Sequence, residues 1–193
     1  MKRSLLFSGA GILFLITTGL VYIPKFMDQG LAGIELTFLS NFFTGFLLIL
    51  DVLSERKKKA IRQELHLAST GILICVMLIS IACIGEANFN GPFMFLHVIN
   101  PLLATVLLIT YTYRGKINFT ATYLGTLCFS IFYFIYVVLY GWYTDDWLYS
   151  IVNIKEKGLL FVICLFLILM FLLTSIEYIL HKLSYLAYKK SGC

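Results

Sequence analysis

The sequence predicts an all-α, polytopic membrane protein with six transmembrane helices, and three observations carry this prediction. Hydrophobic residues make up 60% of the 193 residues and charged residues only 13%, with a mean hydropathy of +0.91. The apolar residues come in blocks of about twenty, the length that a helix needs to cross a bilayer. Basic residues gather at alternate ends of these blocks, as expected for a chain that crosses the membrane repeatedly. A soluble globular fold is therefore excluded.

The predicted spans follow one another along the whole chain. They cover residues 5–23, 33–50, 67–85, 92–112, 119–141 and 158–181. The first block follows Lys2 and Arg3, but "TTGLVYIPKF" offers no small-residue cleavage site of the signal-peptide type. We therefore expect this block to remain in the protein as the first span.

The connections between the spans are short. "IPKFMDQGLAG" separates the first two spans, "SERKKKAIRQELH" the second and third, and "GEANFNGP" the third and fourth. A basic turn with Arg114 and Lys116 follows the fourth span, and "GWYTDDWLYSIVNIKEK" separates the fifth from the sixth. Since no connection is long enough to fold separately, we expect residues 1–193 to form one transmembrane domain.

The distribution of Lys and Arg predicts the orientation of the spans. With the N-terminus inside, twelve of the fifteen basic residues lie on the cytoplasmic side: Lys2, Arg3, Arg56, Lys57, Lys58, Lys59, Arg62, Arg114, Lys116, Lys182, Lys189 and Lys190. Three lie outside: Lys25, Lys155 and Lys157. The positive-inside rule therefore predicts a multi-pass plasma-membrane protein with both termini in the cytoplasm. The net charge of +5 then reflects topology and attraction to anionic membrane lipids, and nucleic acid is not an expected partner.

The cysteines and histidines predict neither a metal site nor a disulfide framework, and no cofactor is expected. The cysteines within the spans have no paired spacing: Cys75, Cys83, Cys128 and Cys164. His66 and His181 lie at the inner ends of their spans, opposite to His97, whereas zinc needs three or four converging ligands. The sequence leaves the oligomeric state open.

A few polar residues interrupt the apolar spans. They are Glu35, Thr37, Asn41 and Thr44 in the second span, His97 and Asn100 in the fourth, and Glu177 near the end of the sixth. Such groups are costly in lipid and are functional candidates by default. Glu177 lies close to the inner interface, where we expect it to reach the headgroups or to pair with Lys182.

Thr37 and His97 are expected to lie at the same depth. Thr37 follows Gly33 by four residues and His97 follows Pro92 by five. At a rise of about 1.5 Å per residue, both lie roughly 6 to 8 Å below the outer end of their spans. Helical spacing places further polar side chains on the same two faces, Asn41 and Thr44 beside Thr37 and Asn100 beside His97. These two polar faces can meet across the bundle.

Pro101 is expected to kink the fourth span next to His97. Its ring clashes with the His97 carbonyl and it has no N–H to donate there, so we predict that this carbonyl is freed. At membrane depth such a break is tolerated where protein or a water-filled cavity accommodates the freed group. We therefore expect a small polar pocket in the outer part of the bundle.

A threonine beside a histidine suits acyl transfer. A hydroxyl is a weak nucleophile that needs an adjacent base, and imidazole takes and returns a proton near neutral pH. The prediction is that Thr37 is the nucleophile and His97 the base, with Asn41 or Asn100 orienting the histidine or donating to an oxyanion. Thr44 and Glu35 complete the polar surroundings. A substrate that arrives through lipid would be an amphipathic acyl ester.

Several segments resemble a known family. "ELTFLSNFFTGFLLILDVLSER", "FLHVINPLLATVLLI", "LCFSIFYFIYVVLYGWYTDDWLYSI" and "LILMFLLTSIEYILHKL" are similar, in this order, to the androgen-induced and androgen-dependent membrane proteins, the FAR-17a/AIG-type family, and most of all to its bacterial six-span relatives. The animal members hydrolyse fatty acid esters of hydroxy fatty acids with an intramembrane threonine and a histidine ahead of a proline. The resemblance implies these roles for Thr37 and His97. In the animal pattern the histidine stands five residues before the proline, whereas His97 stands four before Pro101.

Two non-catalytic alternatives stay open. In one, His97, Asn100, Asn41 and Thr37 bind a lipid or a small solute; in the other, they only lock helix packing. The aromatic residues of the last external connection also have two interpretations. They form an interfacial belt, which we favour, or a lid over an outward-facing pocket: Trp142, Tyr143, Trp147 and Tyr149.

Overall fold

The computed structural model describes residues 2–29, 34–56, 62–82, 90–112 and 117–190. In these ranges every regular element is helical. The long helices are α1 (Lys2–Gln29), α2 (Leu36–Arg56), α3 (Gln63–Ala82), α6 (Phe119–Thr144) and α8 (Leu159–Lys190). A further helix is broken into α4 (Pro92–Met94), η1 (Phe95–Ile99), α5 (Asn100–Leu107) and η2 (Leu108–Thr112). The short η3 (Ser150–Val152) and α7 (Ile154–Lys157) lie between α6 and α8.

Six helices within these ranges are long and apolar enough to cross a membrane, which confirms the predicted fold class. The chain is a multi-pass membrane protein. The helices run past several predicted bounds, since α1 continues through Pro24 to Gln29 and α8 continues to Lys190. Hydropathy locates the apolar part of a helix, and the helical hydrogen bonds continue into the polar residues beyond it. Some residues used for the sequence predictions lie outside the described ranges: Gly33, Lys57, Lys58, Lys59, Cys83, Arg114 and Lys116.

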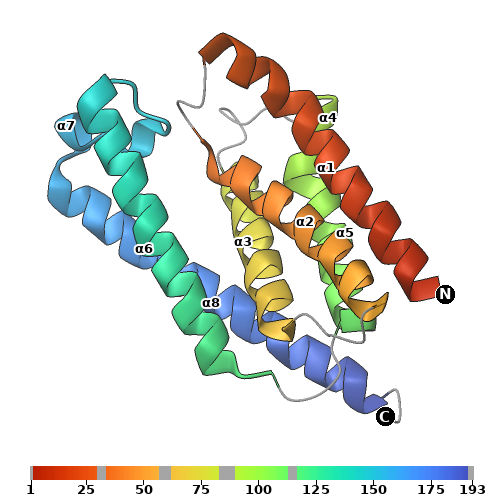
Figure 1. Cartoon of the computed structure of the whole chain (residues 1–193). Coiled ribbons are helices and arrows are strands. Elements are labelled where there is room, and N and C mark those ends of the chain that lie inside the picture. Colours follow the sequence, from red (N-terminus) through yellow and green to blue (C-terminus); the bar gives the residue numbers. More distant parts are fainter. Residues whose placement is uncertain (1, 30–33, 57–61, 83–89, 113–116, 191–193) are drawn as a thin grey trace.

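The helices form two groups that meet at α3. Helix α1 packs along α2, and both contact the broken α4–η2 helix, while α6 and α8 form a hairpin on the other side of α3 (Figure 1). The two chain termini lie at the same end of the bundle (Figure 1). Large apolar side chains are exposed on α6 and α8, such as Phe132, Leu160 and Phe171, as expected of helices that face lipid.

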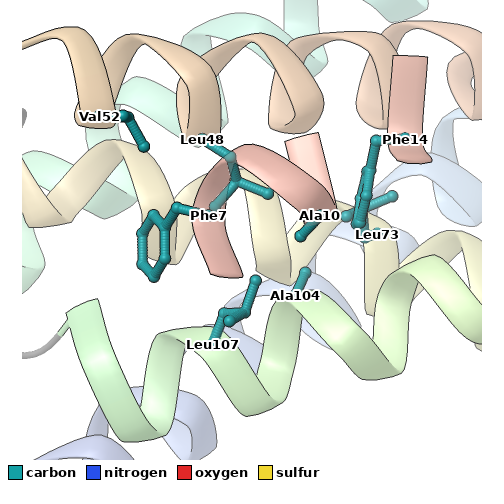
Figure 2. Packing of buried hydrophobic residues seen from close by; sticks show 8 residues of the cluster. All are labelled: Phe7, Ala10, Phe14, Leu48, Val52, Leu73, Ala104 and Leu107. Atoms are coloured by element: carbon teal, nitrogen blue, oxygen red, sulfur yellow. The ribbon is translucent and has the colours of Figure 1, made fainter. Parts of the chain in front are cut away.

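A close crossing of α1 and α2 holds the first group together. A Cβ atom added at Gly11 would lie 2.9 Å from the Gly45 carbonyl oxygen, and one added at Gly45 would lie 2.8 Å from Phe14 Cβ. Small residues at such a crossing let two membrane helices approach closely, and the gain is packing rather than removal from water. Figure 2 shows the resulting apolar cluster, in which Phe7, Ala10 and Phe14 of α1 lie between residues of the neighbouring helices: Leu48, Val52, Leu73, Ala104 and Leu107.

Glu177 does not reach the interface or pair with Lys182, so that prediction was wrong. The side chain is fully buried, and its Oε1 accepts a hydrogen bond of 2.6 Å from Thr126 Oγ1 of α6. Gly71 explains this position, because a Cβ atom there would lie 2.7 Å from Glu177 Cγ. The missing side chain on α3 therefore makes room for a carboxyl group between three helices. Lys182 instead places its Nζ 5.4 Å from the centre of the Tyr178 ring.

A second buried carboxyl group, which the sequence analysis did not single out, lies near the end of the bundle that carries the termini. Asp51 Oδ2 accepts a hydrogen bond of 2.6 Å from Arg3 Nη2 and lies 3.7 Å from His66 Nε2. The Arg3 guanidinium also lies 4.5 Å from the centre of the Phe7 ring. This cluster ties α1, α2 and α3 together and places His66 far from His97, as expected.

We predict that Gly11→Ala lowers the thermal stability of the purified protein, because the new methyl group meets the Gly45 carbonyl and Ile49. Overpacking of this kind costs about 1–3 kcal/mol. Gly9→Ala is the matched control, since nothing lies within 4 Å of a Cβ atom there. That variant should unfold at or above the wild-type temperature, because alanine is the better helix former by about 1 kcal/mol. Equal melting temperatures for the two variants in detergent would contradict the close crossing.

Candidate functional site

The polar residues of interest gather at the end of the bundle opposite the termini. Thr37 lies one residue after α2 begins, and His97 lies in η1, near the start of the broken helix. Ser80 lies two residues before α3 ends. Because α3 runs antiparallel to the other two helices, the end of α3 meets their beginnings. All three side chains are buried there.

The broken helix has a π-turn, and this changes which carbonyl Pro101 frees. The Asn100 N–H bonds to the Phe95 carbonyl, five residues back. With the same five-residue spacing, the residue that should donate to the Leu96 carbonyl is Pro101, which has no N–H. Asn41 Nδ2 of α2 supplies the missing donor at 3.3 Å from the Leu96 oxygen. The predicted break is present, but the carbonyl that α2 satisfies belongs to Leu96 rather than to His97.

Two asparagines join three helices beside this break. Asn100 Nδ2 donates to Asn41 Oδ1 at 2.8 Å and to Thr17 Oγ1 of α1 at 3.1 Å. Asn41 Nδ2 donates to the Thr37 carbonyl at 2.9 Å as well as to Leu96. Both asparagines are fully buried. The two predicted polar faces therefore do meet across the bundle.

This network corrects the roles expected for the asparagines. Each Nδ2 group has two hydrogens, and each already makes two hydrogen bonds to neighbouring groups. These bonds hold the helices together and occupy the amide hydrogens that an oxyanion would need. Thr44 lies outside the network, because its Oγ1 donates to the Ser40 carbonyl of its own helix at 2.8 Å.

The hydroxyl group that contacts His97 belongs to Ser80 and not to Thr37. Ser80 Oγ lies 2.9 Å from His97 Nδ1, and the Phe93 ring is stacked nearly parallel to the imidazole at 6.4 Å between ring centres. The sequence analysis missed Ser80. A signal was present, since residue 80 lies five residues before the predicted end of the third span, at the depth assigned to Thr37 and His97.

Thr37 and Ser80 both line a cavity of about 200 Å³ between α2, α3, α6 and α8. Tyr133 and Tyr149 lie at the same end of this cavity, and its walls are otherwise mostly apolar. Ile72 lies eight residues before Ser80 on α3, so the cavity follows this helix for about 12 Å. An apolar slot with polar groups at one end is the general form of a site for an amphipathic ligand.

Three tyrosines hold the start of α2 at the polar end of the cavity. The Ile34 N–H donates to Tyr136 and the Leu36 N–H to Tyr149, each at 3.0 Å. Tyr133 donates to the Ile34 carbonyl at 3.2 Å, and its oxygen lies 3.2 Å from that of Tyr149. The first N–H groups of a helix have no partner within the helix, so these hydroxyls fix the position of Thr37.

The aromatic residues of the last connection differ in their surroundings, because Tyr149 lines the cavity and others are exposed. Burial raises the pKa of the Tyr149 hydroxyl above the ordinary value, so the side chain is neutral at physiological pH and can both accept and donate. It lines the cavity, whereas Trp142 and Tyr143 are exposed, as expected of an interfacial belt. The belt interpretation therefore fits Trp142 and Tyr143, and Tyr149 is part of the candidate site.

Glu35 links α1 to the start of α2 beside Thr37. Tyr22 donates to Glu35 Oε2 at 2.7 Å, and Lys25 forms an ion pair with the same carboxylate. In the part of the chain that the structure describes, no three His, Cys, Asp or Glu side chains converge as metal ligands.

We predict that Asn41→Leu destabilises the fold, because it leaves the Leu96 carbonyl and an Asn100 hydrogen without partners. Interhelical hydrogen bonds in membranes contribute about 1 kcal/mol each, so the loss is roughly 1–2 kcal/mol. Thr44→Val is the matched control on the same helix, since its hydroxyl bonds only within α2. Thermal unfolding in one detergent measures both variants, and an Asn41→Leu protein as stable as Thr44→Val would refute the bridging role.

No protein-family model, no curated protein and no solved structure matches this chain. The candidate site therefore stands on the geometry of its own residues.

Proposed function

We propose that the protein is an integral membrane hydrolase of lipid esters. A single observation carries the proposal, namely that a hydroxyl at the polar end of an apolar cavity, that of Ser80, is in contact with the buried imidazole of His97. His97 is the general base, and a hydroxyl at this end of the cavity attacks the ester carbonyl. The cavity holds the acyl chain.

The chemistry needs only groups that lie at this end of the cavity. A hydroxyl becomes a useful nucleophile when a base takes its proton as the new bond forms. Imidazole can take this proton and return it to the leaving alcohol. The walls of the cavity are mostly apolar, and apolar surroundings strengthen the interactions that stabilise an oxyanion.

The substrate class follows from the shape of the cavity and its position in the membrane. An acyl chain fits the apolar part along α3, and the ester group then lies among the hydroxyls of Thr37, Ser80 and Tyr149. The resemblance described above adds a specific candidate, a fatty acid ester of a hydroxy fatty acid. Simple acyl esters of other amphipathic alcohols fit the same description.

We further propose that the protein lies in the plasma membrane with both termini in the cytoplasm, which places the site in the outer half of the bilayer. The excess of Lys and Arg at the end that carries the termini supports this orientation. In intact cells, a membrane-impermeant maleimide should label a cysteine introduced at Glu156 but not one introduced at Lys189. The reverse pattern would invert the orientation.

For the activity, we predict that His97→Gln lowers the rate of ester hydrolysis by about 10²–10⁴-fold, the usual contribution of a general base. The measurement is release of free fatty acid from a hydroxy-fatty-acid ester by purified protein in nanodiscs. His181→Gln is the control, since this histidine lies against Phe119 at the start of α6, whereas His97 contacts a hydroxyl that lines the cavity.

Size-exclusion profiles and melting temperatures establish that the variants are folded. A folded wild-type protein that hydrolyses no acyl ester would refute the proposal. If that protein still bound the ester, the non-catalytic lipid-binding alternative would take its place.

A further inference from the structure

We propose that Ser80, and not Thr37, is the nucleophile of this site, and that Thr37 binds the substrate beside it. This inference rests on the proposed function and names the residue that carries the acyl group. It follows from three properties of Ser80: its contact with the base, its pairing with that base instead of with a carbonyl of its own helix, and its place in the cavity wall.

Ser80 has the base and Thr37 does not. Ser80 Oγ lies 2.9 Å from His97 Nδ1, within the range required for proton transfer. Among the described residues, no hydrogen bond joins Thr37 Oγ1 to His97, whose hydroxyl neighbour is Ser80. A hydroxyl beside an imidazole has a group that takes its proton near neutral pH, whereas a hydroxyl without such a neighbour does not.

The hydroxyl of Ser80 is paired with His97 instead of with its own helix. Serine and threonine side chains in helices usually donate to a carbonyl of the preceding turn, as Ser40, Thr44 and Ser69 do here. Among the described residues, Ser80 makes no such bond, and its partner is His97. With the imidazole proton on Nε2, Nδ1 is an acceptor and Ser80 is its donor.

The Ser80 side chain also faces the space that the substrate would fill. Ser80 lines the cavity between α3 and the α6–α8 hairpin, while His97 lies behind it on the broken helix. Ser80 thus lies between the cavity and His97. The nucleophile can reach a substrate in the cavity while the base contacts the nucleophile, as acyl transfer requires. Thr37 lines the same end of the cavity, where its hydroxyl can donate to the ester or the oxyanion after rotation about one bond.

The reaction balances with these groups and one water molecule. Ser80 Oγ attacks the ester carbonyl carbon, and the hydroxyl proton passes to His97 Nδ1. The bond from carbon to the alcohol oxygen breaks, and the alcohol leaves with that proton. Water then attacks the acyl-serine and gives a proton to His97 Nδ1. The carbon–Oγ bond breaks, Ser80 regains the proton, and the fatty acid is released.

The test is the position of a covalent adduct in the wild-type protein. The probe is a fluorophosphonate with a long alkyl chain, applied to protein in nanodiscs and followed by proteolysis and mass spectrometry. The expected adduct is on the peptide that carries Ser80. An adduct on Thr37 would overturn this inference and leave the hydrolase proposal standing, whereas absence of both adduct and ester hydrolysis would overturn both.

Variants give an independent readout. Ser80→Ala should abolish labelling and lower hydrolysis at least 100-fold, while Ser69→Ala should change neither, since Ser69 is a buried serine at the other end of the same helix. Ser80→Cys keeps a nucleophile beside His97, so its residual hydrolysis should become sensitive to a thiol reagent. Labelling of folded Ser80→Ala at the wild-type level would contradict the assignment.

Discussion

The arrangement of the site depends on one missing hydrogen bond. Pro101 has no N–H, and in the π-turn that precedes it the Leu96 carbonyl therefore lacks a main-chain donor. In lipid no water replaces the missing partner of such a carbonyl, so a donor from another part of the fold stabilises it. Asn41 does so, and Asn100 fixes Asn41 in turn. The hydrogen bond from Asn41 to the Leu96 carbonyl thus joins the broken helix to α2.

His97 lies next to that contact and takes its position from it. The π-turn rotates the residues before Pro101 relative to an unbroken helix, and in this register His97 meets Ser80 of α3. Tyr133, Tyr136 and Tyr149 act in a similar way on α2. Their hydroxyls hold the start of this helix and with it Thr37. Buried polar bonds thus place each reactive group at the end of a cavity that is otherwise apolar.

Depth was predictable from the sequence, and so was the meeting of the polar faces that carry Asn41 and Asn100, whereas the partner of each single polar side chain was not. Hydropathy and basic residues gave six spans, and counting residues placed Thr37 and His97 in the same layer. The same reasoning missed the contact of Ser80 with His97, because a single serine in an apolar span carries no signal of the direction it faces. Glu177 was assigned to the interface for the same reason. Its burial depends on Gly71 of another helix, where the missing side chain leaves room for the carboxyl group.

The proposed chemistry depends on the pairing of His97 Nδ1 with the hydroxyl of Ser80. The most direct test is nuclear magnetic resonance of the protein with ¹⁵N-labelled histidine, in the wild type and in Ser80→Ala and Thr37→Ala variants. The Nδ1 resonance of His97 should shift when Ser80 is replaced and stay in place when Thr37 is replaced. A resonance that responds to Thr37 and ignores Ser80 would contradict it.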